Sequence, residues 1–350
     1  MMNKKAWENL LNKGLSENAY PCYAAAFGRG SEVYFRSIGG NRACFPSPLP
    51  LTEDTLFDMA SLSKLMGTTM AALRLIEQGK LHLTDTVGDY FDNCHGKEDI
   101  TIHHLMTHTS GITSFFHMWK MDVSPNDAPD VILAHPLAAP TGTKVIYSCM
   151  GYILLGKIME KICGEPLDKI VTREVLQPLG LNNTMYCPGN ERICVTTEKK
   201  PGSEEYICGH VHDENAHFLN GISGNAGLFS TFDDVIKFSQ MLSLHGKDYI
   251  SPEIFEYAIT DHTKDLPSLS RGLGFQLYRD GVFPGGCQLS RGSYGHTGFT
   301  GTSIYVDKNT DCFCILLTNR VHFGRDTNKF FEYRRAFYDK VFSDLKETKL

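Results

Sequence analysis

The chain of 350 residues is long enough for one large domain or two medium-sized ones. Its 34 lysines and arginines are outnumbered by 40 aspartates and glutamates, and no basic run interleaved with aromatic residues is visible, so no nucleic-acid partner is expected. The longest apolar stretches, such as residues 23–27 and 313–317, are far shorter than the roughly 20 residues that a membrane helix needs. No membrane association is therefore predicted.

The cysteines and the N-terminus bear on the compartment. Eleven cysteines, an odd number without a CxxC pair, fit reduced thiols better than a disulfide framework. Residues 1–11 include basic side chains but no uninterrupted apolar core, so they are typical of an amphipathic helix and not of a secretory signal. We therefore expect a cytoplasmic protein.

The first predicted elements are a helix that ends near Tyr20 and a hairpin with strands at residues 22–27 and 32–38. Apolar residues then recur at steps of three and four over residues 62–76. This spacing predicts a mostly buried helix, and Gly79 suits the position just past its end.

The middle of the chain is predicted to be mostly helical. Short helical patterns separated by Gly, Pro and Asn occur at residues 102–106, 131–134, 152–162 and 167–175. A longer helix is expected to follow Ser230 and to end near Leu244, with Thr231 and Asp234 in the spacing of a capping box.

Strand character returns near the C-terminus. The β-rich segments are residues 273–278, 302–306 and 312–318. A final helix is expected at 329–345, and its aromatic side chains, Phe330 and Phe331 among them, are interpreted as packing on the sheet and not as binding a ligand.

The order of these elements predicts an α+β fold. Strands near both chain ends, with helices between them, indicate an antiparallel sheet flanked by helices and built from both ends, with an inserted, mostly helical domain. We assign residues 1–78 and 215–350 to the sheet domain, and residues 79–214 to the inserted domain.

The sequence SLSK at residues 61–64 is the most informative local pattern. Near the start of a helix, Ser61 and Lys64 lie on one face. A serine hydroxyl is a poor nucleophile at neutral pH, whereas a lysine with a pKa lowered by burial can act as its base. The alternative is that Ser61 caps the helix and Lys64 lies at the surface. The same spacing at residues 343–346, in the polar tail, is not expected to have a function.

Two further segments carry chemistry-bearing side chains. Tyr147, Ser148 and Cys149 precede a helical pattern, so Tyr147 is expected to lie in a loop. Later, YGHTGFTGT at residues 294–302 leads into a strand, and its small residues allow a ligand to approach the backbone closely. We expect a substrate to lie along this strand edge.

Together, residues 61–64, 147–149 and 296–298 resemble the S-x-x-K, Y-x-N and K/H-T-G signatures of the serine β-lactamase and penicillin-recognising superfamily. The nearest branch is that of the class C β-lactamases with their esterase, D-aminopeptidase and D-Ala-D-Ala peptidase relatives. The family's connecting segments are similar to residues 105–111, 211–213 and 224–231. The resemblance therefore spans nearly the whole chain, and it implies the same inserted-domain architecture.

The resemblance also implies roles for individual residues. Ser61 would accept the acyl group, and Lys64 and Tyr147 would share proton movement between the serine, the leaving group and water. The backbone N–H groups of Ser61 and Phe299 would form an oxyanion hole, in which each donor contributes about 2.7 to 4 kcal/mol. The substrate-binding residues would be Cys149, His296, Thr297, Gly298 and Phe299.

Two of these residues depart from the family pattern. Cys149 stands where the family usually has Asn, and a thiol cannot offer the donor and acceptor pair of an amide. His296 stands where β-lactamases have Lys, and its reference pKa of about 6.5 leaves it largely neutral at pH 7. We therefore expect poor penicillin hydrolysis. Amide substrates remain possible, because some D-Ala-D-Ala peptidases of the family also have His at this position.

Other polar residues have simpler interpretations. Asp58 and Asp213 either orient catalytic side chains or cap helices. Ser63 is a rival nucleophile, but on a helix it points away from Lys64. No metal site is predicted, because no known ligand spacing is repeated among His108, His210, His212 and His217. His108 is interpreted as stabilising a turn.

The sequence thus predicts a cofactor-free serine hydrolase that cleaves a small ester or amide through an acyl-enzyme on Ser61. Two alternatives stay open. His296 suggests a D-Ala-type peptidase or amidase that acts on cell-wall fragments, and Cys149 suggests a non-catalytic binding protein on the same fold.

Overall fold

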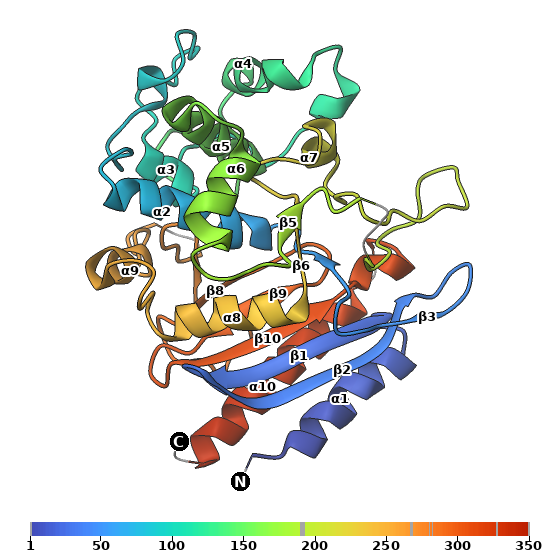
Figure 1. The fold of residues 1–350 in the computed structure, drawn as a ribbon. Coiled ribbons are helices and arrows are strands. Elements are labelled where there is room, and N and C mark those ends of the chain that lie inside the picture. The colour runs from blue at the N-terminus through green and yellow to red at the C-terminus, as the bar shows by residue number, and fades with distance from the viewer. Residues whose placement is uncertain are drawn as a thin grey trace.

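A seven-stranded antiparallel sheet, in the order β3-β2-β1-β10-β9-β8-β7, forms the lower half of the molecule (Figure 1). The computed structural model describes residues 2–189, 193–266, 269–279, 281, 283–326 and 328–348. The strands are β1 (Cys22–Arg29), β2 (Glu32–Ala43), β3 (Leu49–Pro50), β7 (Gln276–Leu277), β8 (Tyr294–Thr297), β9 (Ser303–Val306) and β10 (Cys312–Thr318). Because β1 pairs with β10, the sheet is built from both ends of the chain, which confirms the predicted fold class.

Helices cover both faces of this sheet. One face carries α1 (Lys4–Ser16) and α10 (Lys329–Thr348), and the other carries α8 (Phe232–Ser243) (Figure 1). Alternate residues of β1 enter two different cores: Tyr23, Ala25 and Phe27 pack in the core that contains Trp7 of α1, whereas Ala24 and Ala26 belong to the larger core. Because both faces are buried, β1 is apolar almost throughout.

The remaining helices lie above the sheet in Figure 1. They are α2 (Met70–Glu77), α3 (Ile102–Met106), α4 (Ala128–Ala134), α5 (Cys149–Cys163), α6 (Leu167–Val171), α7 (Glu214–Phe218) and α9 (Pro252–Ala258), with short helical turns η1 (Lys64–Thr69), η2 (Val87–Asp89), η3 (Met118–Lys120), η4 (Pro125–Asp127), η5 (Thr172–Leu176) and η6 (Arg320–Phe323). A three-stranded sheet, β4 (Phe57–Asp58), β6 (Leu228–Ser230) and β5 (Met185–Tyr186), lies between the two halves.

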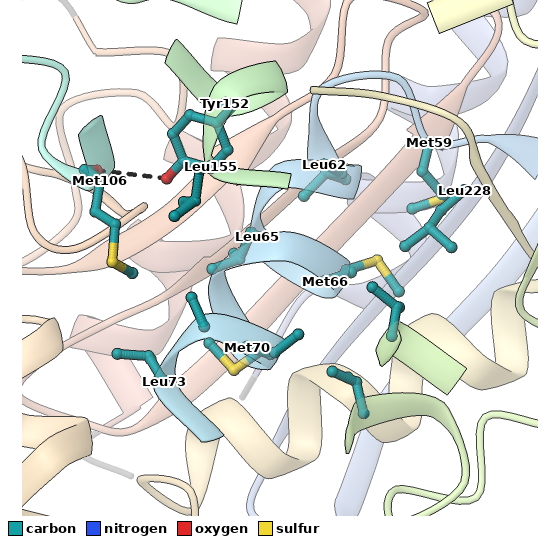
Figure 2. Packing of buried hydrophobic residues seen from close by; sticks show 14 of the residues in the cluster. Met59, Leu62, Leu65, Met66, Met70, Leu73, Met106, Tyr152, Leu155 and Leu228 are labelled. Carbon is teal, nitrogen blue, oxygen red and sulfur yellow. Dashed lines mark hydrogen bonds between the residues drawn. The ribbon is translucent and has the colours of Figure 1, made fainter. Parts of the chain in front are cut away.

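The segment that follows Ser61 is the most buried helix of the fold. It begins as the π-helical turn η1 and continues as α2, and its side chains Leu62, Leu65, Met66 and Met70 pack among neighbours from other elements (Figure 2). Figure 2 also shows the hydroxyl of Tyr152 on α5, which donates to the carbonyl of Met106 at 3.4 Å. The predicted buried helix is confirmed, and Gly79 follows its end with a φ of +67°.

Three local predictions were wrong. The first helix ends at Ser16, before Tyr20. The strand predicted at residues 273–278 is reduced to β7, which pairs with only two residues of β8. The capping box does not form, because Asp234 instead accepts a hydrogen bond from the backbone N–H of Asn183 at 2.7 Å, across to another segment. Local spacing did not anticipate that tertiary partner.

The domain boundaries at residues 78–79 and 214–215 stay a prediction. Within the described part of the chain, no helix combines the length and apolarity that crossing a membrane requires.

Candidate active site

A strained turn places Ser61. Ala60, directly before it, has a φ of +46°, which a residue with a side chain rarely adopts. The buried carboxylate of Asp58 holds this turn by accepting hydrogen bonds from the N–H of Ala60 at 2.8 Å and of His212 at 2.7 Å. Burial raises the pKa of Asp58, and the two N–H groups oppose that rise. Of its two interpretations, Asp58 therefore orients the segment that carries Ser61 and does not cap a helix.

Lys64 is fully buried beside Ser61. Its Nζ donates to Ser61 Oγ at 3.1 Å and to the backbone carbonyl of Asn225 at 2.8 Å. The alternative that placed Lys64 at the surface is therefore wrong. Ser63 points elsewhere, as expected, and its Oγ accepts a hydrogen bond from the N–H of Leu228 at 3.0 Å.

Tyr147 lies against the same lysine. Lys64 Nζ is 5.0 Å from the centroid of the Tyr147 ring. The Tyr147 hydroxyl is buried and has no hydrogen bond of normal geometry to a described residue, yet it is close enough to Ser61 and Lys64 for both to lower its pKa. Burial is the larger effect and raises that pKa overall. The phenol is therefore neutral in the resting site.

Cys149, the first residue of α5, is the third partner of Lys64. Its Sγ lies 3.4 Å from Lys64 Nζ. Burial disfavours the ammonium of Lys64, but the negative charge that Cys149 or Tyr147 carries when deprotonated would stabilise it, and the net effect is a raised pKa of Lys64. The expectation of a lysine base with a pKa lowered by burial is therefore wrong. Burial also raises the pKa of Cys149. The three groups thus compete for the same protons in a space with little water.

Two structural residues hold the Tyr147 loop and its surroundings. His108 Nδ1 accepts a hydrogen bond from the N–H of Ser148 at 3.1 Å, and its ring centroid is 4.5 Å from that of Tyr147. Its interpretation as a turn-stabilising residue is confirmed. Asp213 caps α7 by accepting from the N–H of Ala216 at 2.8 Å.

The segment of residues 296–298 lies directly against the turn before Ser61. Thr302 Oγ1 donates to the carbonyl of Met59 at 3.1 Å. A Cβ added at Gly298 would lie 2.4 Å from the same carbonyl, so only glycine allows this approach. Since β7 pairs with β8 only at Tyr294 and Gly295, the edge of β8 at His296 is left unpaired by that strand. The predicted strand edge therefore borders the candidate site.

His296 is buried and neutral. Its Nδ1–H donates to the carbonyl of Thr297 at 2.8 Å, and burial holds the pKa of the ring well below its usual value. Arg271 and Lys64 lower that pKa further. His296 therefore does not supply a positive charge at pH 7.

The backbone N–H groups of Ser61 and Phe299 are available to a ligand. Within the described residues, neither donates a hydrogen bond. The Phe299 side chain is 46 % exposed, and its ring stacks on that of His212 with centroids 5.7 Å apart. This arrangement matches the requirement for two unoccupied donors near the nucleophile.

Two cavities meet at Ser61 and Tyr147. The first, of about 320 Å³, is lined further by His296, Thr297, Gly298 and Arg271. The second, of about 280 Å³, lies on the other side and is lined further by Cys149 and Phe115. Both are of a size that fits small-molecule fragments. The structure thus brings all eight predicted site residues around one point: Ser61, Lys64, Tyr147, Cys149, His296, Thr297, Gly298 and Phe299.

Comparison with known proteins decides the family. Residues 7–337 match the family described as Beta-lactamase. The chain belongs to the Beta-lactamase family. Together with its relatives, this membership identifies a serine hydrolase.

Two curated relatives of this family member carry hydrolase names. It is 30% identical, over 79% of its length and 70% of the relative's, to the N-acetylmuramyl-L-alanine amidase of Bacillus subtilis (strain 168). It is 27% identical, over 90% of its length and 82% of the relative's, to the putative D-alanyl-D-alanine carboxypeptidase of Escherichia coli (strain K12).

Solved structures of similar fold include a hydrolase and a class C β-lactamase. The hydrolase EstCE1, described as having promiscuous acyltransferase activity, superposes with a TM-score of 0.80 at 22% identity and covers 97% of this chain and 98% of its own. A class C β-lactamase superposes with a TM-score of 0.78 at 20% identity, over 98% and 96% of the two chains. These likenesses show that the Beta-lactamase family member has the fold of the family's serine hydrolases.

The sequence did not reveal one notable residue of the site. Arg271 is buried, its guanidinium carbon is 5.3 Å from the centroid of the Tyr147 ring, and it lines the cavity that contains Ser61. Arg271 follows no motif in the sequence, and only its glycine on the C-terminal side hints at a loop. The interpretation of Phe331 as a packing residue is incomplete, because Phe331 also lines this cavity.

Proposed function

We propose that this Beta-lactamase family member hydrolyses a small ester or amide through an acyl-enzyme on Ser61. The observation that carries the proposal is the hydrogen bond of 3.1 Å between Lys64 Nζ and Ser61 Oγ, at the junction of two cavities that Tyr147 also lines. Acyl transfer needs a nucleophile, proton-transferring groups within hydrogen-bond reach of it, and space for the substrate around it.

Proton movement follows from the charges around Tyr147. The ammonium of Lys64 favours loss of the phenolic proton of Tyr147 to solvent. In this ionised form, a minor one because burial keeps the resting phenol neutral, the Tyr147 oxygen accepts the proton of Ser61 as Oγ attacks the acyl carbon. The bond between the acyl carbon and the leaving group then breaks, and the leaving group receives this proton. In deacylation a water molecule gives a proton to the Tyr147 oxygen as the water oxygen bonds to the acyl carbon, the bond between the acyl carbon and Ser61 Oγ breaks, and Oγ takes the proton back from Tyr147. Lys64 supplies the positive charge throughout.

The developing negative charge on the acyl oxygen is stabilised in this proposal by the N–H groups of Ser61 and Phe299. Both are free of other hydrogen bonds within the described part of the chain. Two such donors, each worth about 2.7 to 4 kcal/mol, are enough to make acylation of Ser61 practical at neutral pH.

Covalent labelling tests the proposal. The purified protein is incubated with a fluorophosphonate, its intact mass is measured, and the modified peptide is sequenced by fragmentation. We expect one adduct per chain, on Ser61. Ser63→Ala is a matched control that keeps the adduct, since Ser63 points to Leu228 and not to Lys64. The absence of any adduct, or an adduct on another residue, would contradict the proposal.

A second candidate is an amidase or peptidase that acts on cell-wall peptide fragments. Arg271 favours it, because a permanent cation in the cavity beside Ser61 can form an ion pair with the carboxylate that such peptides carry. His296 is neutral and cannot form that ion pair. The names of the two curated relatives point the same way. Comparison of turnover for N-acetylmuramyl-L-alanine, D-alanyl-D-alanine peptides and simple esters decides between the two: a higher kcat/KM for one of the amides supports this candidate.

Because His296 is neutral, we expect the preference for a negatively charged ester over an uncharged one not to change with pH. Burial holds the pKa of His296 well below its usual value, so the ring is already neutral over the range from about pH 6.5 to 8 in which an ordinary histidine loses its charge, and no positive charge disappears there. The ratio of kcat/KM for 3-acetoxybenzoate to that for phenyl acetate is therefore expected to stay constant over this range. Use of a ratio cancels the titration of the catalytic groups. A ratio that falls with rising pH would show that a charged His296 binds the carboxylate.

A further inference from the structure

Three buried arginines line the cavity beside Ser61. Arg271, Arg320 and Arg334 are 2 %, 3 % and 7 % exposed. They come from separate parts of the chain: a loop before β7, the turn η6 and the helix α10. The fold therefore gathers three permanent positive charges around about 320 Å³ of space.

None of the three arginines forms a direct ion pair within the described part of the chain, although Glu198 and Asp326 lie near enough to Arg320 to oppose the lowering of its pKa by burial. No carboxylate of a described residue forms an ion pair with any of the three, and the cavity lining contains no Asp or Glu. Arg320 donates only to backbone carbonyls, of Phe299 at 2.9 Å and of Arg325 at 3.0 Å. Arg334 donates to the carbonyl of Pro284 at 3.1 Å.

Arg271 is the least satisfied of the three. Among the described residues, its Nε and Nη1 find no hydrogen-bond partner although both atoms are buried. A buried cation without a counter-ion carries a desolvation cost, and burial lowers the pKa of Arg271 accordingly. An anion in the cavity would offset this cost.

Aromatic rings hold the other two guanidinium groups in place. The Arg320 guanidinium carbon lies 4.5 Å from the ring centroid of Phe299 and 4.8 Å from that of Phe331. Arg334 lies 5.2 Å from Phe331 and 5.3 Å from Phe330. Contact with a ring leaves the N–H donors in the guanidinium plane available for a carboxylate. The two groups are thus positioned before any ligand arrives.

We infer that this cavity binds two negatively charged groups of one substrate, so that the preferred ester or amide carries a dicarboxylate, or a moiety of equivalent charge, on the side that faces Arg271, Arg320 and Arg334. The inference rests on the proposed acyl transfer at Ser61 and adds the class of substrate. One carboxylate can pair directly with one or two of the three guanidinium groups, whereas a second carboxylate gives a direct partner to the group that remains. Bidentate contacts between arginine and carboxylate suit such a site.

A matched substrate series tests the inference. The acetyl ester of 5-hydroxyisophthalate carries two carboxylates, and its dimethyl ester has the same reacting bond without the charges. We expect kcat/KM of the wild type for the dianion to exceed that for the dimethyl ester by at least about tenfold, with a preference that weakens in high salt. The ratio compares two substrates on one enzyme preparation, so a partial loss of folded protein cancels.

Variants locate the effect. Arg271→Gln, Arg320→Gln and Arg334→Gln are each expected to lower this ratio by about fivefold or more. Arg335→Gln is the matched control, because Arg335 is the next residue of α10 and does not line the cavity. An unchanged ratio in all three cavity variants would overturn the inference.

Direct binding separates this inference from the proposed acyl transfer. Isothermal titration calorimetry measures the affinity of the wild type for isophthalate without any turnover, with benzoate and dimethyl isophthalate as controls. We expect isophthalate to bind more tightly than both controls, and more weakly in each arginine variant.

If the kinetic ratio shows no preference while isophthalate still binds through the arginines, the dianion belongs to the acyl side of the substrate. If isophthalate does not bind and the ratio is flat, the inference fails even where Ser61 is labelled. Failure of the label alone counts against acyl transfer and not against the anion site.

Discussion

Ser61→Ala is expected to reduce hydrolysis of phenyl acetate to the uncatalysed rate while the chain stays folded. In the proposed mechanism Ser61 Oγ is the nucleophile; it accepts a hydrogen bond from Lys64, and no other serine of the described chain has that contact. Removal of the nucleophile from a site whose catalytic residues act as a unit lowers kcat by about four to six orders of magnitude. The measurement is steady-state release of phenol, with circular dichroism to verify folding.

The control for this experiment is Ser63→Ala, two residues away on the same segment. Ser63 is buried and binds the backbone N–H of Leu228, so its loss is expected to cost about 1 to 3 kcal/mol of unfolding free energy with little effect on kcat. Residual turnover by Ser61→Ala at more than about one per cent of the wild-type rate would show that the acyl group is transferred elsewhere.

Lys64→Met and Tyr147→Phe are each expected to lower the rate of acylation by about 10² to 10⁴-fold. The charge of Lys64 favours loss of the Tyr147 proton, so in the proposed mechanism both residues act in one proton transfer. The double variant should therefore lose far less than the product of the two single losses. Stopped-flow measurement of the first turnover with a chromogenic ester separates acylation from product release.

Thermal unfolding shows whether the two variants stay folded, so that a loss of activity can be assigned to the mechanism. Lys64 Nζ donates to Ser61 Oγ and to the carbonyl of Asn225, and its surroundings raise its pKa and so favour the ammonium, so replacement by Met is expected to lower the unfolding temperature modestly while the chain stays folded. A stable Lys64→Met protein with normal acylation would remove Lys64 from the mechanism. Multiplicative losses in the double variant would show that Lys64 and Tyr147 act in separate steps.

The sequence determined the fold class and the residues around Ser61. Apolar spacing over residues 62–76 predicted a buried helix, and burial of Lys64 is a direct consequence of that helix. The segments of β1 and β10, which are buried on both faces, could be predicted as strands because each is short, apolar and bounded by turn residues. The resemblance to a known family then ordered Tyr147 and His296 relative to Ser61, which local patterns alone cannot do.

Only the tertiary structure decided the charge of the site. The sequence indicated a largely neutral His296 from its reference pKa alone, and burial together with Arg271 and Lys64 lowers that pKa further. Arg271, Arg320 and Arg334 are separated by many residues and match no motif, so their meeting in one cavity depends on how β7, η6 and α10 pack together. The periodicity of a helix or strand shows which of its faces is buried, whereas the electrostatic potential of a cavity arises from side chains that distant elements contribute. For that reason the nucleophile could be predicted from the sequence, and the positively charged cavity beside it could not.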